Sequence, residues 1–507
     1  MELLEFKNKT FALFGVEKSS DLSTAIMKSG FTEKIFDDYN AIIGDTQKDW
    51  MKHLFQYYEA DREKTKQDYT PICLADSVAF LSRAENEKVC LDMCAGSGAL
   101  TIQKWQSNKE LHFICQEYDE NVIPFLLFNL ALRNIPATVL HCDVLSDEVF
   151  KAWEVKKGAK YATVAECDLP ENVKADCCIS NPPYNMKWTP PVFAQMQPRF
   201  ANCELPPESN ANYAFILTAL NNANVVSMIM PPAILSTENK SEKEIRKYLV
   251  DNNLIDSIVI NPDKMFEITS IGTCFITLRK NRKTTKIEMV DMREHYTVEK
   301  REQNGQYGGA SHENRTYIKE YKTYSDDQQK EMLAAISGFS SINGFSKAVT
   351  IQDVKGNGYT LVPSRYIDRE EVELTHRPYR DIVADITRVV EERNILKITV
   401  NETIAKSLGL YNLFLVSKKS NEIDINKSIE CLGLGVKIPK ENFITCTKNK
   451  GEMKFENMSK DKLSTIFLSI LQMWKQHIMF LNEQENVYLA ELRDAMLPDL
   501  MSGKIEI

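Results

Sequence analysis

The stretch that most constrains the fold of this chain is residues 89–100, VCLDMCAGSGAL. Its first residues form an apolar run typical of a buried strand. Residues 95–98 form a small-residue turn, called the glycine turn below, before a helical segment, residues 100–105. Such a turn lets a ligand approach the backbone at the N-terminus of the helix. The turn lacks the GxGxxG pattern and no Lys follows it, so neither a dinucleotide fingerprint nor a phosphate-gripping P-loop is predicted.

Acidic residues close three predicted strands: Asp92, Glu117 and Asp143. Glu117 lies 19 residues after Gly98, close to the ~20-residue offset at which an acid reaches ribose hydroxyls in dinucleotide-type folds. A predicted helix, residues 121–133, separates the second strand from the third, and this alternation predicts a doubly wound parallel sheet. The three acids and the glycine turn are therefore expected to form one cleft, in which Asp92 suits a ligand bearing a positive amine.

A second motif, Asn181-Pro182-Pro183-Tyr184, follows the apolar run of residues 175–180, which is the fourth predicted strand. The two prolines fix φ and remove two N–H donors, so the backbone there is stiff and rich in acceptors. Asn181 adds a side-chain carbonyl and Tyr184 adds an aromatic face, an arrangement that suits a planar group carrying an NH2. An ordinary proline-rich turn after a strand is the alternative, and the tetrapeptide alone does not decide between the two.

Composition narrows the class of protein. The 507 residues carry a net charge of −9 and no run of ~18 apolar residues, so no membrane span is expected. The N-terminus lacks the pattern of a signal peptide, and the 12 cysteines lack paired metal-ligand spacing, which predicts a cytosolic protein with reduced thiols and no metal site. A protein that wraps DNA alone is usually basic. This chain therefore binds no nucleic acid, binds it through a local patch, or relies on a partner.

Three further strands are predicted at residues 225–230, 254–260 and 273–278, giving a seven-stranded Rossmann-like sheet that ends in a hairpin-like pair. The basic cluster of residues 279–286 fits either a solvated strand end or a phosphate contact. Residues 300–315 are predicted to form a loop.

Helical patterns occur at both ends of the chain. The N-terminal region has apolar residues at helical spacing and is expected to be a helical cap or a partner-docking domain; they are Ile35, Phe36, Tyr39, Ile42 and Ile43. Residues 376–408 are predicted to be helical. Near the C-terminus a helix-packing seam with steps of four and three, in which only Glu485 is off pattern, comprises Phe467, Leu471, Trp474, Ile478, Leu481, Tyr488 and Leu492.

Together these residues resemble the S-adenosylmethionine-dependent methyltransferases that act on N6 of adenine in DNA, and among them the modification (M) subunit of type I restriction–modification systems. The motifs occur in the family's γ order, cofactor motifs first, between residue 69 and about residue 282. The resemblance implies S-adenosylmethionine as cofactor, no metal, and double-stranded DNA with a flipped adenine as substrate. The matching residues are a cofactor-contacting motif, Tyr69, Thr70 and Pro71; a methionine-binding turn, Asp92, Ala95, Gly96, Ser97 and Gly98; a ribose ligand, Glu117; an acid beside the cofactor's adenine, Asp143; and the catalytic Asn181, Pro182, Pro183 and Tyr184.

Segments outside these motifs favour type I. Residues 358–366, GYTLVPSRY, look like the C-terminal segment of the M subunit, and residues 270–274 resemble a late loop that helps to hold the flipped base. Residues 492–503 resemble the helix end of type I specificity (S) subunits, which predicts a helix that docks on an S subunit. Cleavage would belong to a separate restriction (R) subunit, since no nuclease or helicase motif is present. The N-terminal helical region is short for the family, which puts its share of DNA clamping in question.

The predicted organisation has four parts: a helical N-terminal region, residues 1–66; the methyltransferase domain, 67–285; a C-terminal extension, 286–410; and a partner-docking region ending in a long helix, 411–507. Two other functions stay open from the sequence. The same tetrapeptide can serve methylation of a guanine amine in RNA or a glutamine amide in protein. A non-catalytic assembly subunit built around the C-terminal seam is the second.

Overall fold

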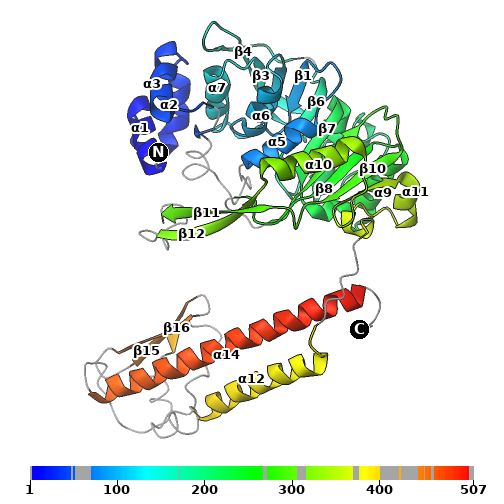
Figure 1. Cartoon of the computed structure of the whole chain (residues 1–507). Coiled ribbons are helices and arrows are strands. Elements are labelled where there is room, and N and C mark those ends of the chain that lie inside the picture. The colour runs from blue at the N-terminus through cyan, green and yellow to red at the C-terminus, as the bar shows by residue number, and fades with distance from the viewer. Residues whose placement is uncertain are drawn as a thin grey trace. The chain divides into compact units, whose positions relative to one another are not determined.

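The computed structural model describes residues 3–46, 49–51, 70–170, 172–266, 271–304, 316–368, 376–399, 422–423, 444–449, 452–457 and 462–501. The chain divides into two compact units, Met1–Glu370 and Glu371–Ile507 (Figure 1). Each unit is described by itself.

The first unit is built on one sheet of 11 strands in the order β13-β10-β8-β9-β7-β6-β1-β2-β3-β4-β5. Its central seven, β8-β9-β7-β6-β1-β2-β3, are parallel except for β9, which is antiparallel to both neighbours. This arrangement confirms the predicted Rossmann-like methyltransferase sheet. The central strands are β1 (Val89–Asp92), β2 (His112–Glu117), β3 (Ala137–Asp143), β6 (Ala175–Ser180), β7 (Ala223–Met230), β8 (Ile255–Ile260) and β9 (Cys274–Arg279).

Four more strands extend the predicted sheet at its two edges. At one edge, β4 (Glu148–Lys156) and β5 (Thr163–Glu166) add antiparallel strands after β3. At the other edge, β10 (Lys286–Asp291) pairs in parallel with β8 and β13 (Ser346–Thr350) pairs antiparallel with β10. The tetrapeptide therefore follows the sixth strand along the chain and not the fourth. β4 and β5 were missed because most of their side chains are exposed or half-buried, so they lack the apolar run of a buried strand.

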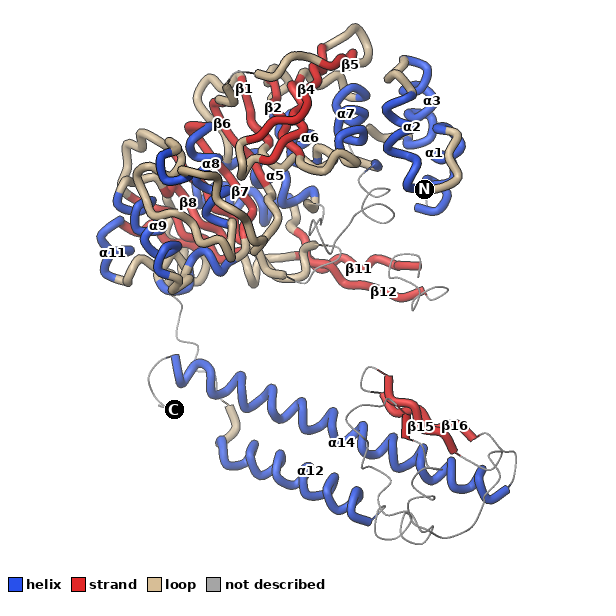
Figure 2. Tube along the Cα trace, turned by 180° about the vertical axis from the view of Figure 1, so that it is seen from behind, coloured by secondary structure: helices blue, strands red, loops and turns tan. Residues whose placement is uncertain are grey.

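Helices cover both faces of this sheet (Figures 1 and 2). Successive residues of the central strands alternate between two hydrophobic clusters: Cys90 belongs to one and Leu91 to the other, as period-2 side-chain alternation requires. The first cluster includes residues of α5 (Ile72–Leu81), α6 (Ala99–Ser107), α7 (Ile123–Leu132) and α10 (Asp326–Gly338), and the second residues of α8 (Asn212–Asn222), α9 (Lys240–Asp251) and α11 (Ile351–Gly356).

The N-terminal helices pack against α7. They are α1 (Leu3–Phe14), α2 (Leu22–Lys28) and α3 (Glu33–Ile43). The ring of Phe128 on α7 lies 5.0 Å from the ring of Phe36 and 5.0 Å from that of Tyr39, both from α3. The predicted helical region is thus joined to the sheet domain by an aromatic cluster worth more than its buried area alone.

The two arginines of the basic cluster, residues 279–286, form ion pairs within the chain. At these two positions the cluster is neither a solvated strand end nor an open phosphate site. Arg279 and Arg282 both bind the carboxylate of Asp256, at 3.0 Å and 3.1 Å. Arg279 also donates to the backbone carbonyls of Arg83 and Leu81 at 2.8 Å and 2.9 Å. These guanidinium groups therefore tie the end of β9 to β8 and to the end of α5.

Residues 300–304, predicted as loop, belong to β11 (Thr297–Asn304), which forms an antiparallel hairpin with β12 (Thr316–Thr323). Both strands are rich in polar and charged side chains, so their sequence lacks the apolar pattern of a buried strand. Among the described residues, no helix is both long enough and apolar enough to cross a membrane.

The second unit contains the long helix α14 (Lys462–Met501), which packs against α12 (Tyr379–Thr399). Three short strands accompany these helices: β14 (Glu422–Ile423), β15 (Ile444–Asn449) and β16 (Glu452–Asn457). Residues 400–408 of the predicted helix, and the side chains of the first three seam residues, lie outside the described parts. Ile478 and Leu481 of the predicted seam are buried, at 8% and 1% exposure.

Charged pairs complete this helix interface. Glu485, the residue that breaks the apolar seam, forms an ion pair with Arg393 of α12. Arg393 also donates from Nη1 to Asn482 Oδ1 at 2.9 Å. A second pair joins Arg377 to both carboxylate oxygens of Glu491, at 2.8 Å each. The off-pattern acid is thus explained by the cation that faces it.

This pair predicts an asymmetric response to mutation. Glu485→Leu alone should lower the free energy of unfolding of the second unit by about 2–3 kcal/mol, because it leaves the largely buried Arg393 without its anion. The double variant Arg393→Met with Glu485→Leu should recover most of that loss, since an apolar pair continues the seam. Urea denaturation followed by helical circular dichroism measures both, and equal losses in the single and double variants would contradict the assignment.

Candidate active site

The register of the parallel strands gathers the predicted site residues at the carboxyl ends of the central strands. Asp92 at the end of β1 pairs with Cys115 of β2 and with Ile179 of β6. The amide of Met93 donates to the Ile179 carbonyl at 3.1 Å, two residues before Asn181. Because the strands run in parallel, the glycine turn, the strand-end acids and the tetrapeptide all follow carboxyl ends on the same side of the sheet.

Asp92 is fully buried, and its carboxylate is only half satisfied. Oδ2 accepts a hydrogen bond from the Thr101 hydroxyl at 2.6 Å, whereas Oδ1 is buried without a hydrogen-bond partner in the described part of the chain. Burial raises the pKa of Asp92 to about 7. The Thr101 hydroxyl and the backbone amides of Thr101 and Cys94 oppose that rise, whereas the charge of Glu117 adds to it. A buried carboxylate with an unpaired oxygen would be stabilised by a ligand that brings a positive amine to it.

The glycine turn is bonded to Glu117. The amide of Gly96 donates to Glu117 Oε2 at 2.8 Å, while Oε1 accepts from the amides of Tyr118 and Asp119 at 2.9 Å each. A carboxylate offers about four lone-pair positions, so Oε2 retains room for one more donor such as a ribose hydroxyl. Burial raises the pKa of Glu117, and the three amides oppose that rise.

Position 98 requires glycine. It has φ of +96° at the N-cap of α6, and an added Cβ would lie 3.1 Å from Leu126 Cδ1. The left-handed backbone lets α6 begin at once after the turn, with its first amides facing the carboxyl ends of the strands.

Asp143, the third predicted acid, lies half-buried at the end of β3. Its Oδ1 accepts a hydrogen bond from the amide of Leu145 at 2.9 Å, at the start of the turn that leads from β3 into the antiparallel β4. The register pairs Glu117 with His141, so Asp143 projects two residues further on the same side of the sheet.

The tetrapeptide is bonded to the start of α5. Asn181 donates from Nδ2 to the Thr70 hydroxyl at 2.9 Å, although 111 residues separate them. Its Oδ1 accepts a hydrogen bond from the Tyr184 hydroxyl at 2.6 Å. Pro71 is the N-cap residue of α5, and Tyr69 lies outside the described residues. The structure thus brings Thr70 and the tetrapeptide together as one hydrogen-bonded group.

The tetrapeptide is also held from its other side. Asn212, 1% exposed at the start of α8, accepts from the Asn185 amide at 3.0 Å and donates to the Asn185 side chain at 2.9 Å. This two-bond clamp fixes the residue that follows Tyr184. Sequence reasoning missed Asn212 because a lone asparagine at a helix start is read as an ordinary end residue.

Asp49 is a second residue that the sequence did not reveal. Its Oδ2 accepts from the Ser97 hydroxyl at 2.6 Å and its Oδ1 from Asn129 Nδ2 at 2.9 Å. Asn129 Nδ2 also donates to the Ser97 carbonyl at 2.8 Å. The network links the end of the N-terminal helical region to the glycine turn. No local pattern marks Asp49, because its partners lie 48 and 80 residues away.

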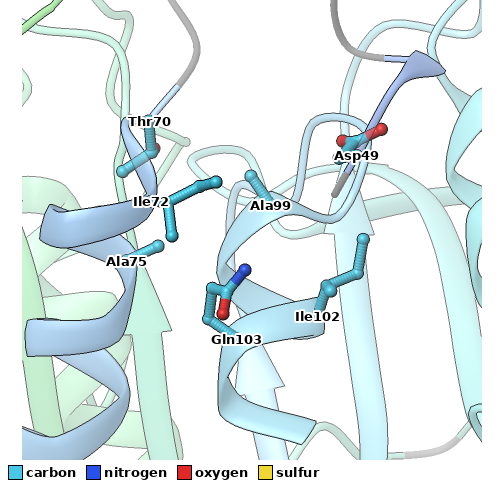
Figure 3. Close-up of a pocket in the computed structure, with 7 residues that line it drawn as sticks. All are labelled: Asp49, Thr70, Ile72, Ala75, Ala99, Ile102 and Gln103. Carbon is cyan, nitrogen blue, oxygen red and sulfur yellow. The ribbon is translucent and has the colours of Figure 1, made fainter. Parts of the chain in front are cut away.

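A small pocket opens beside this network, between α5 and α6 (Figure 3). Thr70 and Asp49 lie at one end of it in the close-up, and Gln103 lies at the other. Its lining residues are Asp49, Thr70, Ile72, Ala75, Ala99, Ile102 and Gln103. The pocket borders the helix that follows the glycine turn, so it adjoins the predicted cofactor site.

Comparisons with known proteins agree with this geometry. The sequence pattern of the family described as N-6 DNA Methylase matches residues 44–374, well over half of the chain. This chain is a member of the N-6 DNA methylase family. The family uses S-adenosylmethionine, the cofactor predicted from the sequence. The matched span includes every predicted site residue.

Individual relatives of this N-6 DNA methylase are distant. It is 25% identical over 383 residues to the type I restriction enzyme MjaVIII methylase subunit of Methanocaldococcus jannaschii, covering 73% of this chain and 58% of that protein. It is 22% identical to the HindI methylase subunit of Haemophilus influenzae, covering 71% of this chain and 78% of that one. A solved type I methyltransferase subunit from Streptococcus thermophilus shares the fold, with a TM-score of 0.50, 22% identity, and 67% and 64% of the two chains covered.

The raised pKa of Asp92 predicts pH-dependent cofactor binding. Only the ionised carboxylate attracts the amine, so affinity for S-adenosylmethionine should rise about tenfold per unit as the pH approaches ~7 and level off above it. The free energy of unfolding of the cofactor-free protein should fall as the pH rises toward ~7, because Asp92 in the unfolded chain releases its proton at a lower pH than in the folded protein. Calorimetric titration of the wild type and of Asp92→Asn measures the effect, and an equal pH dependence in both would refute the assignment.

The Asp49 network predicts a loss of cofactor affinity from a residue outside the predicted motifs. Asp49→Ala leaves the Ser97 hydroxyl without its acceptor and removes one of the two acceptors of the Asn129 amide. This loss loosens the turn and should weaken binding about tenfold. Asp49→Asn keeps one acceptor oxygen and should lose less. The exposed Asp38→Ala serves as control, and calorimetric affinities equal to that control would show that Asp49 does not position the turn.

Proposed function

We propose that this chain transfers a methyl group from S-adenosylmethionine to N6 of an adenine in DNA, as the modification subunit of a type I restriction–modification system. The observation that carries the proposal is the Thr70–Asn181–Tyr184 hydrogen-bonded group, held beside the glycine turn by the parallel β1–β6 pair. Membership of the N-6 DNA methylase family supports the same reaction.

The residues of the site suit direct transfer. When bound, the cofactor supplies an activated methyl group on a sulfonium, so the chain has mainly to align its two ligands. Asn181 Oδ1 and the Pro182 carbonyl are two acceptors for the hydrogens of an adenine amine, whose lone pair is otherwise delocalised into the ring. Accepting both hydrogens would move the nitrogen toward tetrahedral geometry and make the lone pair available.

Thr70 orients the amide of Asn181 in this scheme. Because Nδ2 donates to the Thr70 hydroxyl, Oδ1 is the group turned toward Tyr184 and the substrate side. The Tyr184 hydroxyl occupies one lone pair of that oxygen in the free protein, so a substrate amine must share the oxygen or displace the hydroxyl. The ring of Tyr184 would then stack on the flipped base, which offsets part of the few kcal/mol needed to extrude it.

Partner subunits account for the acidic balance of the chain. With a net charge of −9 and with Arg279 and Arg282 bonded to Asp256, this chain is poorly equipped to grip a duplex alone. We assign sequence recognition to an S subunit, with the α12–α14 pair as its docking element, and cleavage to a separate R subunit. Acting on the DNA of its own cell, the protein would work in the cytoplasm.

The other functions raised by the sequence are less well supported. Methylation of guanine in RNA or of glutamine in protein can use the same tetrapeptide, but the matched family is one of DNA methylases. A non-catalytic assembly role gives no reason for the half-satisfied Asp92 or the Thr70–Asn181 bond. Incubation with labelled cofactor and DNA, RNA or protein separates these functions, and label in RNA or protein alone would reject the proposal.

The tetrapeptide supplies the sharpest test of mechanism. Asn181→Ala should reduce methyl transfer by at least about 10³-fold, because it removes the acceptor, while cofactor affinity changes little. Tyr184→Phe should keep activity within a few-fold, since the ring remains and Oδ1 is released, whereas Tyr184→Ala should lose about 10- to 100-fold. Transfer of labelled methyl to unmethylated DNA measures the rate. Parallel loss of cofactor binding in Asn181→Ala would reject its catalytic role.

A further inference from the structure

Three exposed apolar side chains, called the tip below, lie in the segment that follows the tetrapeptide. Val192, Phe193 and Met196 are 82%, 74% and 78% exposed, the highest values among the exposed large apolar side chains of the described residues. Phe193 also has φ of +62°, a left-handed conformation that is unfavourable for a residue with a side chain. Large apolar groups placed in water on a strained backbone contribute nothing to the stability of the fold, so a role in binding is indicated.

The base of this tip is firmly built. Trp188 is 7% exposed and donates from Nε1 to the Pro207 carbonyl at 3.0 Å. Gln195 donates from Nε2 to the carbonyls of Phe200 and Cys203, at 2.9 Å each. The amide of Met196 closes a turn onto the Phe193 carbonyl at 2.8 Å. These bonds hold the apolar side chains in a defined position.

The segment is anchored beside the candidate active site. Arg199, 7% exposed, donates to the backbone carbonyls of Val144 and Leu145 at 2.8 Å and 2.7 Å. Those carbonyls directly follow Asp143, the acid at the end of β3. The other end of the segment continues from Tyr184 through Asn185, which Asn212 clamps. The tip is therefore presented from an anchor between two predicted parts of the site.

Charge points to a polyanionic partner. Residues 181–203 contain no Asp or Glu, in a chain that has 71 acidic residues against 62 basic ones. Their exposed cation is Lys187, because Arg199 is buried and bonded to backbone carbonyls. A stable protein interface buries ~800 Å² on each partner, far more than three side chains offer. Apolar wedges of Phe, Met and similar residues instead enter the stack of bases where a duplex is opened.

We propose that Val192, Phe193 and Met196 form a wedge that enters the DNA base stack and fills the space left by the flipped adenine. The inference rests on the proposed function, because it presupposes a base drawn out of a duplex. The wedge would keep the neighbouring pairs stacked while Tyr184 holds the extruded base, and it would oppose return of that base.

The first test compares variants of the full chain, purified with the partners it assembles with, on unmethylated chromosomal DNA. Phe193→Ser should lower kcat/KM for methylation about 10- to 100-fold, as expected for loss of an aromatic stacking contact. Phe193→Trp should retain most activity, and affinity for S-adenosylmethionine should not change in either. Ile318→Ser, which alters an exposed apolar residue of β12 at 68% exposure, is the matched control. Equal activity of Phe193→Ser and the control would overturn the wedge.

Photocrosslinking identifies the partner directly. A benzophenone amino acid in place of Phe193 should form adducts with DNA, and one in place of Ile318 should not. Adducts with protein alone, or none at all in an assembly that methylates DNA, would overturn the wedge and leave the proposed function standing. If the wild-type assembly methylates no DNA, the proposed function fails and the wedge fails with it.

Discussion

Parallel pairing of β1 with β2 and β6 is the constraint on which the candidate site depends. In a parallel sheet the carboxyl ends of all strands lie on the same side. Asp92, Glu117 and the tetrapeptide therefore come together although they lie far apart in sequence. The bond from the Met93 amide to the Ile179 carbonyl continues the β1–β6 pairing past the last residue of β1. A shift of register in this pair would separate the glycine turn from the tetrapeptide.

Contacts from outside the sheet then give the site its chemical definition. Thr70 orients the amide of Asn181, Asn212 holds the residue after Tyr184, and Asp49 binds the hydroxyl of Ser97. These polar groups are buried or half-buried, so each lost partner leaves an unsatisfied group whose cost exceeds the net worth of the bond. The site is thus preorganised by contacts within the chain.

Charge is used differently in the two units. In the first unit, Arg279 and Arg282 are bonded to Asp256 and to backbone carbonyls, so these basic residues support the fold. In the second, Arg393 meets the acid that interrupts the apolar seam of α14. The segment after the tetrapeptide, residues 185–203, differs from both in having no acidic residue.

The sequence by itself determined the sheet class, the glycine turn, the three strand-end acids and the tetrapeptide, because apolar runs, small residues and prolines act over a few positions. It missed β4, β5, β13 and the β11–β12 hairpin, whose strands are largely exposed, strongly polar or at an edge of the sheet. It also missed β10, which is buried but has a charged residue at three of its six positions and so lacks an apolar run. Only the tertiary structure decided the roles of Asp49, Asn212 and Arg279. Their partners are distant along the chain, and a polar side chain shows its partner only once the intervening chain has folded.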